Sequence, residues 1–359
     1  VVVSCRTEAW RRLEQHFRGV GQFYRTDDGV EVRLPQFTED ELPDVYGKYQ
    51  RSYDLKANFS GLTDTARRFI ADPLMLRFVA EGYRGQELPR DPRSVDVFDS
   101  YYRDKVGDGD DAQMDRLEKA FVSRLVELMY QARTDELSER ALSGDEQIGQ
   151  AVLASHDVNS PYFRLLDKGV VTRVQVGRRG YGAAALFGGG PAEPETRVQF
   201  TYDRFFEYLL AYRVIPGEPT EQRVRELLAQ AETHRYQSLW GALKARLLGH
   251  LERAPAAASP SGVIAQLARD ADHSMRGLLG DLLIAYGQQR PSRTAVLLTE
   301  TLLQSDSESS GLVVIIAGHQ LEMPEVLRQA FLHPSALVSQ MAMQTICFYC
   351  TKHPQEGDV

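Results

Sequence analysis

Cysteine and long hydrophobic runs are both scarce in this chain. Only 3 of its 359 residues are cysteine, too few for a disulfide framework, which indicates a reducing compartment. No apolar run approaches the roughly 18–20 residues of a membrane-spanning helix. The first residues also lack the charged, apolar and small-residue order of a signal peptide. We therefore expect a cytoplasmic protein without a membrane partner.

Positive charge is low as well. The chain carries 42 Lys and Arg against 50 Asp and Glu, a formal net charge of −8. A general nucleic-acid coat needs a basic surface, so nucleic acid is not an expected partner, although this balance leaves room for a local basic patch.

The motif that cradles a nucleoside triphosphate, G-x-x-x-x-G-K-[ST], is missing. Gly47-Lys48 is followed by Tyr49, and the three glycines at 188–190 have no lysine behind them. No apolar strand ends in the paired acids that would hold Mg²⁺. The chain alone therefore offers no predicted catalytic residue and no predicted metal ligand.

The amino-terminal part is predicted to contain a short α/β segment and then helices. Val1–Cys5 has the apolar pattern of a buried parallel strand, and a second strand is expected to end near Leu34. Thr38 is a predicted helix N-cap with three acids behind it. From there the pattern stays helical to about residue 142.

The pattern changes after residue 142. The sequence YFRLLDKGVVTRVQV is typical of a helix, a glycine turn and a strand, and TRVQFT predicts a second strand. Between them lies a segment rich in Gly and Pro. Helix, strand, long loop and strand in this order predict a winged helix, and a further helix starts near Phe205.

From about residue 220 onward every element is predicted to be helical. Segments with a polar start and an apolar face recur at roughly 30–40 residues, a period typical of stacked helix pairs of the HEAT or armadillo kind. Pro291, Pro324 and Pro334 are expected between helices, where proline is tolerated.

Three stretches, in this order, resemble the latter part of a NACHT-type STAND ATPase: VVVSCR, DPLMLRFVAEGY and FTYDRFFEYLLAY. That family includes animal inflammasome and bacterial antiviral NLR-like proteins. The resemblance implies a mainly α fold with a remnant of a P-loop α/β sheet, a helical lid, a winged helix and HEAT/armadillo-like repeats. The implied domains are 1–50 (end of the nucleotide-binding domain), 51–110 (lid), 111–216 (winged helix) and 217–359 (repeat sensor region).

The resemblance also implies nucleotide-binding residues. Ser4-Cys5-Arg6 matches the family's T-S-R, which makes Arg6 a sensor of the γ-phosphate. Asp72-Pro73-Leu74 matches the family's N-P-L, which places Pro73 against the adenine. The implied cofactor of the complete protein is ATP or ADP with Mg²⁺, the metal ligands lying outside this chain.

In the third stretch the chain departs from the family. The family often carries F-x-H, with the histidine on the β-phosphate of ADP, whereas this chain has Phe200 followed by Tyr202. Glu207-Tyr208 fits the downstream Glu-[Phe/Tyr]. A phenol can hydrogen-bond a phosphate, but it lacks the cationic form of an imidazole, so the ADP-locked state is in question.

Each of these residues has a structural alternative. Arg6 fits a surface arginine before a helix, and Pro73 fits the first helical position after an Asp72 cap. Tyr202 fits a core phenol equally well. A further set is expected in the core rather than in a site: Phe205, Phe206 and Tyr208.

Two further patterns resemble metal sites, but each has a simpler structural interpretation. Cys347-x-x-Cys350 with His333 and His353 could supply four zinc ligands, but cysteines three apart on a helix usually form a small apolar face. The acids Asp108, Asp110 and Asp111 lack the glycine and the distal glutamate of a calcium loop, so they are expected to be solvated.

The predicted function is a nucleotide-controlled signalling switch that is closed with ADP and open with ATP. A ligand or protein would be sensed by the repeats, activated protomers would form a homo-oligomer, and an amino-terminal effector domain would act in antiviral defence or programmed cell death. One alternative is a non-enzymatic helical-repeat scaffold or winged-helix DNA-binding regulator, using Arg173, Arg178, Arg179 and Arg197 on the wing. Another is a degenerate ATPase remnant.

Overall fold

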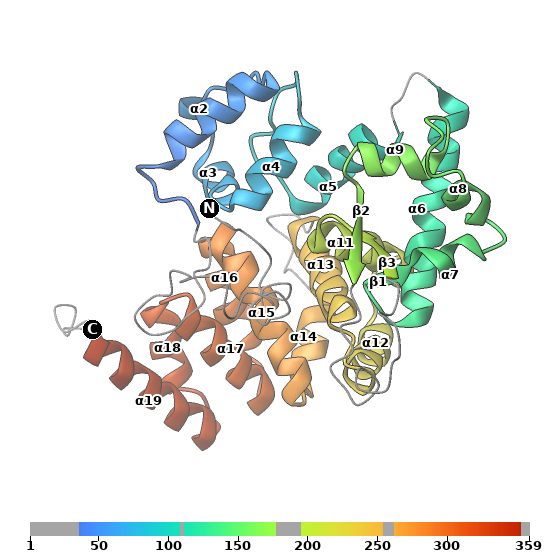
Figure 1. The fold of residues 1–359 in the computed structure, drawn as a ribbon. Coiled ribbons are helices and arrows are strands. Elements are labelled where there is room, and N and C mark those ends of the chain that lie inside the picture. The colour runs from blue at the N-terminus through green and yellow to red at the C-terminus, as the bar shows by residue number, and fades with distance from the viewer. Residues whose placement is uncertain (1–35, 108–110, 177–194, 254–261, 353–359) are drawn as a thin grey trace, which may run out of the picture.

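The computed structural model describes residues 36–107, 111–176, 195–253 and 262–352 (Figure 1). The predicted strand Val1–Cys5, the strand ending near Leu34 and Arg6 lie outside the described residues, as does the loop 177–194. Within the described part the chain is mainly helical and has one small β-sheet, which confirms the prediction of a mainly α fold.

Residues 42–107 form a helical segment, called the first helical segment below. Its elements are α2 (Leu42–Tyr53), η1 (Phe59–Gly61), α3 (Asp64–Ile70), α4 (Pro73–Gly82), α5 (Ser94–Tyr102) and η2 (Arg103–Gly107). Thr38 is not the N-cap residue that was predicted, because Glu41 immediately precedes α2. Thr38 and Glu41 instead bind each other's backbone amides with their side-chain oxygens, at 3.0 and 3.3 Å, in the turn before the helix. The helix itself begins at Leu42, and the domain boundary predicted between residues 50 and 51 falls inside it.

Helices α4 and α5 form the apolar centre of the first helical segment. The ring of Phe78 on α4 meets the rings of Phe98 and Tyr101 on α5 edge-on, at centroid distances of 5.0 and 4.8 Å. All three rings are buried. Complete burial of a large apolar side chain contributes about 1.5–3 kcal/mol, so this aromatic cluster holds α4 on α5.

Residues 112–200 combine helices with the sheet. The elements are α6 (Ala112–Ala132), β1 (Glu136–Ser138), α7 (Glu139–Ser143), α8 (Gly149–Leu153), α9 (Pro161–Asp167), β2 (Val171–Val176) and β3 (Glu195–Phe200). The strand order is β1-β3-β2 and both pairings are antiparallel, with Leu137 opposite Val198 and Val171 opposite Phe200. The predicted helix, glycine turn and strand are α9, Gly169 at a φ of 68° and β2.

After β3 every element of the described chain is helical. These elements are α11 (Asp203–Val214), α12 (Glu221–Thr233), α13 (Gln237–Arg253), α14 (Gly262–Arg269), α15 (His273–Gln289), α16 (Pro291–Val296), η3 (Leu297–Leu302), α17 (Glu308–Gln320), α18 (Pro324–Phe331) and α19 (Ala336–Lys352). Consecutive helices pair, and α13, α15, α17 and α19 contact one another in series along the stack (Figure 1).

Glycines allow the close contacts within this stack. A Cβ atom at Gly280 of α15 would lie 2.9 Å from Cγ2 of Ile316 on α17, and one at Gly311 of α17 would lie 2.8 Å from both methyl groups of Val338 on α19. Pro334 lies between α18 and α19 as predicted, but the other two prolines do not lie between helices. Pro291 and Pro324 occupy the first turns of α16 and α18. Proline is tolerated there because the backbone amide of a first-turn residue has no hydrogen-bond partner within the helix.

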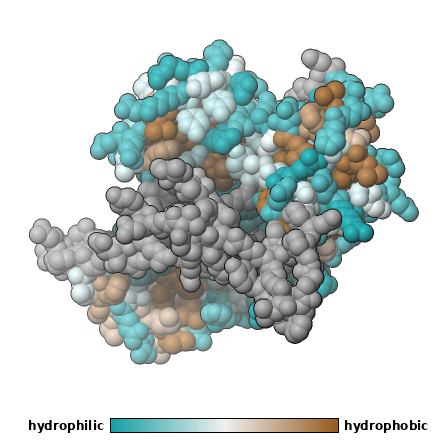
Figure 2. All heavy atoms as spheres, in the orientation of Figure 1, coloured by the Kyte–Doolittle hydropathy of each residue, from teal (hydrophilic) through white to brown (hydrophobic). Residues whose placement is uncertain are grey.

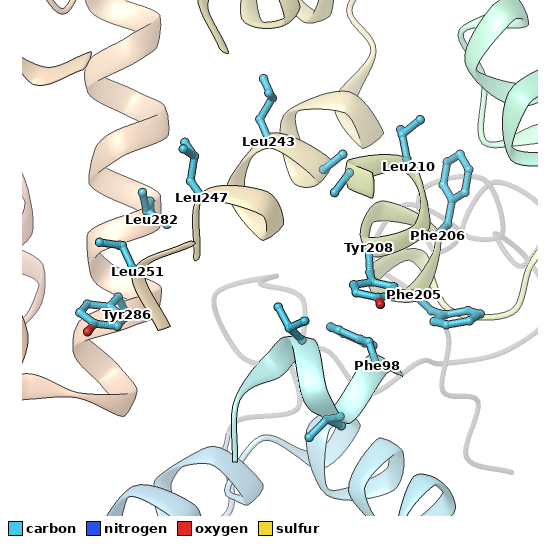
Figure 3. Packing of buried hydrophobic residues seen from close by; sticks show 14 of the residues in the cluster. Phe98, Phe205, Phe206, Tyr208, Leu210, Leu243, Leu247, Leu251, Leu282 and Tyr286 are labelled. Atoms are coloured by element: carbon cyan, nitrogen blue, oxygen red, sulfur yellow. The ribbon is translucent and has the colours of Figure 1, made fainter. Parts of the chain in front are cut away.

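A single apolar core runs through the described chain. Figure 3 shows how it passes from Phe98 on α5 to Phe205 and Tyr208 on α11, then to Leu247 on α13 and Tyr286 on α15. Because these helices share one core, the first helical segment and the carboxyl-terminal helices pack directly on each other.

The last two helices also carry apolar side chains on their outer surface. The exposed ones are Phe331, Leu332, Leu337, Met341, Met343 and Phe348. In Figure 2 apolar colours gather in the lower left part, where Figure 1 places α17 to α19. Leu332 is the most exposed of these side chains, at 77%.

Candidate functional site

The start of α4 and the start of α11 meet, and their residues form what we call the α4–α11 junction: Asp72, Pro73, Arg77, Tyr202 and Arg204. Nη1 of Arg204 lies 2.7 Å from Oδ2 of Asp72. The guanidinium of Arg77 lies over the ring of Tyr202, 5.4 Å from its centroid. Two of the three residues implied by the family resemblance, Pro73 and Tyr202, are therefore brought to one place.

Asp72 has two tasks at the junction. Its Oδ1 accepts hydrogen bonds from the backbone amides of Leu74 at 2.9 Å and Met75 at 3.3 Å, which makes it the N-cap of α4. Its Oδ2 pairs with Arg204 from α11. The same carboxylate thus starts one helix and links it to another.

Tyr202 lies on the connection between β3 and α11. It has an extended backbone and immediately precedes the helix, while Phe200 and Phe205 on either side are buried in the core. Its half-buried ring packs edge-on against Phe78, with the centroids 5.1 Å apart. The ring is therefore part of the aromatic cluster and lies against α4.

A charge network lies beside this ring. The buried carboxylate of Glu81 on α4 forms ion pairs with Arg77 at 2.8 Å and with Lys105 at 3.1 Å. Burial disfavours the ionised form of this carboxyl group. The hydrogen bonds and charges of Arg77 and Lys105 favour that form more strongly, so the pKa of Glu81 is lowered. Each of the three cations at or beside the junction, Arg204 included, has a carboxylate partner.

The backbone amides at the start of α4 are already engaged. Those of Leu74 and Met75 donate hydrogen bonds to Asp72. No group of three or more His, Cys, Asp and Glu in the described ranges is arranged to hold a metal ion. A cavity of about 510 Å³ lies on another face of α5, lined by Tyr83, Pro89, Asp96, Asp99, Tyr102 and Arg103, and neither Pro73 nor Tyr202 lines it.

The other residues of the third stretch are structural. Phe205, Phe206 and Tyr208 are 1%, 2% and 7% exposed, which confirms that they belong to the core. The Tyr208 hydroxyl donates a hydrogen bond to Asp99, and burial together with this bond raises the pKa of Tyr208. Glu207 faces α13, since a Cβ atom at Gly241 would lie 2.0 Å from its Oε1.

The basic residues of the predicted wing and of the helix before it are paired. Glu118 on α6 is completely buried and binds Arg164 at 2.9 Å and Lys168 at 2.7 Å, the two cations of α9. Arg173 on β2 binds Glu139 at 2.7 Å.

On β3, Arg197 binds Glu136 at 2.5 Å and Glu195 at 3.1 Å. Arg178 and Arg179 lie outside the described residues. Four described cations, two from α9 and its end and one each from β2 and β3, are therefore engaged with carboxylates of the same chain.

The two metal-like patterns have other roles. Cys347 on α19 is exposed and Cys350 is half-buried, so the predicted buried apolar face at these cysteines is wrong: α19 turns this side outward. His333 is buried and binds the Ser305 carbonyl and the Ser335 amide, while His353 lies outside the described residues. Asp111 is the N-cap of α6, and Asp108 and Asp110 are not described.

The comparisons with known proteins bring no family. No protein-family model, curated protein or solved structure matches this chain. Among the described helices, none has the length and apolar character needed to cross a membrane.

Sequence reasoning missed several residues of this region. Arg77, Glu81 and Arg204 were not singled out, although the spacing of Arg77 and Glu81 at i, i+4 is a known helix pairing signal. The partner of Arg204 is 132 residues away in the sequence, so no local pattern could indicate it.

Proposed function

We propose that this chain is the switch portion of a nucleotide-controlled signalling ATPase of the NACHT-type STAND class. The complete protein would bind ATP or ADP with Mg²⁺ in the cytoplasm, stay closed with ADP and open with ATP. It would form a homo-oligomer after a ligand or protein is sensed by its carboxyl-terminal helices, and act through an effector domain in antiviral defence or programmed cell death.

The observation that carries the proposal is the α4–α11 junction. Two stretches that resemble separate family motifs, around Pro73 and around Tyr202, meet in the folded chain and are tied by the Asp72–Arg204 ion pair at 2.7 Å. A nucleotide that touches both motifs needs them to lie together. Their meeting is therefore what the proposed function requires of this part of the chain.

The order of elements supports a winged helix for residues 111–216. Helix α6, strand β1, helices α7 to α9 and the antiparallel pair β2 and β3 follow one another, with β3 in the centre of the sheet. In the sequence, the segment that joins β2 to β3 is rich in Gly and Pro, as the wing of such a fold can be.

The stack of helices supports a repeat region for residues 217–359. Helix pairs from α12 to α19 succeed one another, and each second helix contacts the next one in the series. Repeats of the HEAT or armadillo kind bury their apolar faces in this way, each against its neighbours.

The paired cations favour a switch over a DNA-binding regulator. Affinity for duplex DNA comes largely from Lys and Arg that neutralise phosphates. Here Arg164 and Lys168 would have to leave the buried Glu118, and Arg173 would have to leave Glu139. Removing partners from a buried carboxylate is costly, so this face is poorly suited to duplex binding.

Each residue of the junction has a defined task under this proposal. The closed and open states would be distinguished by the charge of the bound nucleotide, ADP or ATP. Pro73 would pack against its base, and the Tyr202 hydroxyl would hydrogen-bond a phosphate oxygen. Arg204 holds α11 to α4 through Asp72.

The switch itself follows from differential contacts. A nucleotide shifts a two-state equilibrium only if it binds one state more tightly than the other. The junction supplies such a difference because its residues come from two elements, α4 and α11, that must stay together to contact one ligand. Separation of α4 from α11 would remove these contacts.

Two experiments test the proposal. The coding sequence upstream of Val1 should encode a GKS or GKT loop roughly 80–100 residues earlier. In the complete protein, Tyr202→Phe should weaken ADP binding about tenfold, because it removes one hydrogen bond to a charged group. Tyr49→Phe, on α2 and away from the junction, is the matched control. A complete protein without such a loop and without nucleotide affinity would overturn the proposal.

A further inference from the structure

The start of α5 is held against the carboxyl-terminal helices by a buried carboxylate. Glu252, in the last turn of α13, is 4% exposed. Its Oε2 accepts a hydrogen bond from the backbone amide of Ser94 and its Oε1 accepts one from the Ser94 hydroxyl, both at 3.0 Å. Ser94 is the first residue of α5, so this carboxylate binds two donors at the start of another helix.

A second polar contact lies beside the first. Nη1 of Arg290, between α15 and α16, donates a hydrogen bond to Oδ2 of Asp91 at 3.0 Å, and Nη2 lies 2.9 Å from Oδ1 in the same ion pair. The Arg290 side chain is 5% exposed, whereas Asp91 is 54% exposed. The loop before α5 is therefore anchored to a second carboxyl-terminal helix.

The side chain of Val95 also packs closely against the backbone of α13 here. A Cβ atom at Gly249 of α13 would lie 2.6 Å from Cγ2 of Val95 on α5. Helix α3 of the first helical segment contacts α15 nearby. We call Asp91, Ser94, Glu252 and Arg290 the clamp, since they join the first helical segment to α13 and α15.

Several charges surround Glu252. Arg290 comes from the α15–α16 side, Asp91 from the loop, and Arg93 and Asp96 from the start of α5, where they pair with each other at 2.6 Å. On α13 itself, His250 binds Glu218 at 2.8 Å, and Arg253 donates to the Tyr212 hydroxyl.

Burial is the strongest influence on the Glu252 carboxyl. It raises the pKa of Glu252 to about 7, against the opposing effects of the Ser94 hydrogen bonds and the Arg290 charge, and with a smaller contribution from Asp96. An exposed glutamate has a pKa of about 4.3. The docked arrangement therefore binds the Glu252 proton more tightly than an undocked one would.

We propose that the clamp is a proton-controlled contact, in which loss of the Glu252 proton loosens the first helical segment from α13 and α15. The neutral carboxyl group stays in the buried position at a lower desolvation cost, although only its carbonyl oxygen remains a good acceptor for a hydrogen bond from Ser94. The ionised group remains there at a higher cost, because it has left water. This control needs no nucleotide and goes beyond the proposed switch.

The direction with pH follows from the two ionisation states. Since docking raises the pKa of Glu252, the stabilisation of the docked state is complete at low pH and is lost as the pH rises through about 7. Between pH 6 and pH 8 the equilibrium constant for docking should fall about tenfold.

Amide hydrogen exchange of this chain at pH 6 and pH 8 measures the effect, with exchange times corrected for the intrinsic change in rate. The peptides that report on the clamp cover Val95–Phe98 and Gly249–Glu252. Their protection in the wild-type chain should be about tenfold lower at pH 8. Peptides from α18 should show no such change.

Glu252→Gln keeps the shape and cannot ionise, so its protection should be the same at pH 6 and pH 8. His250→Gln, which changes a neighbouring side chain on α13 and leaves Glu252 in place, is the control and should keep the wild-type difference. Asp91→Asn weakens the Arg290 contact, so it should lower protection at both pH values and leave the ratio unchanged.

Two results would overturn the proposal: equal protection of wild-type α5 at both pH values, or an unchanged difference in Glu252→Gln. If Glu252→Gln fails to fold, as judged by circular dichroism, Ser94→Ala is the second variant. It removes one hydrogen bond that favours the ionised form, so it should move the midpoint of the transition to higher pH. A midpoint that stays in place would contradict the role of Glu252.

Discussion

Glu118 on α6 lies between two cations of α9, with Arg164 at 2.9 Å and Lys168 at 2.7 Å. The carboxylate is completely buried, whereas the two cations are 28% and 24% exposed. This triad fixes α9 on α6 and engages both cations in ion pairs within the chain.

Glu118→Gln should therefore destabilise the chain. The substitution leaves two partly buried cations without their carboxylate, and since both still reach water we expect a loss of about 1–3 kcal/mol. Urea unfolding measures it. Glu146→Gln, at an exposed position, should stay within about 0.5 kcal/mol of wild type. Equal stability of the two variants would contradict the triad.

Asp72 allows its two tasks to be separated. Asp72→Ala removes both the N-cap and the partner of Arg204, and should cost about 1–2 kcal/mol. Asp72→Asn keeps an oxygen that can cap α4 and loses only the half-exposed ion pair, which should cost less than about 0.5 kcal/mol. Thermal unfolding of the two variants distinguishes these cases, and a larger loss in Asp72→Asn would show that the ion pair dominates.

Gly249 should not tolerate a side chain. Alanine is the better helix former by about 1 kcal/mol, but its Cβ would lie 2.6 Å from Val95, so Gly249→Ala should lose about 1–3 kcal/mol. Gly277→Ala is the matched control, because its Cβ would lie 3.5 Å from Trp240, an ordinary contact. That variant should be as stable as wild type or slightly more stable. Val95→Ala should rescue Gly249→Ala if the clash is the cause.

The Glu81 carboxylate should contribute to acid sensitivity. Because folding lowers the pKa of Glu81, its stabilisation is present above the ordinary glutamate range and is lost as the pH falls through the lowered value. Glu81→Gln should reduce the stability at pH 7 and flatten the decline below pH 5. The midpoints of urea unfolding from pH 7 down to pH 4 provide the comparison. A decline as steep as that of wild type would assign the acid sensitivity to other carboxylates.

Local signals in the sequence predicted the local parts of this structure. Asp72 and Pro73 mark the start of α4 because capping and proline at the first position act within one turn. Gly169 marks the turn into β2 because few other residues adopt its positive φ. The buried Phe205 and Phe206 followed from the apolar pattern of α11.

The parts that depend on distant residues could not be predicted in this way. Strand β1 has three half-buried residues, too few for an alternating pattern, and it exists because it pairs with β3. Glu118 and Glu252 lie on helices where an acid usually faces water, and their partners are 46 to 158 residues away.

The α4–α11 junction combines two kinds of contact that respond differently to ionic strength. Added salt screens the half-exposed Asp72–Arg204 pair over distances of about 10 Å at 0.1 M. Strongly hydrated salts such as sulfate favour burial of the Tyr202 and Phe78 rings. Salt weakens the ion pair while sulfate strengthens the ring contact, so the attachment of α4 to α11 should persist from dilute buffer to concentrated sulfate.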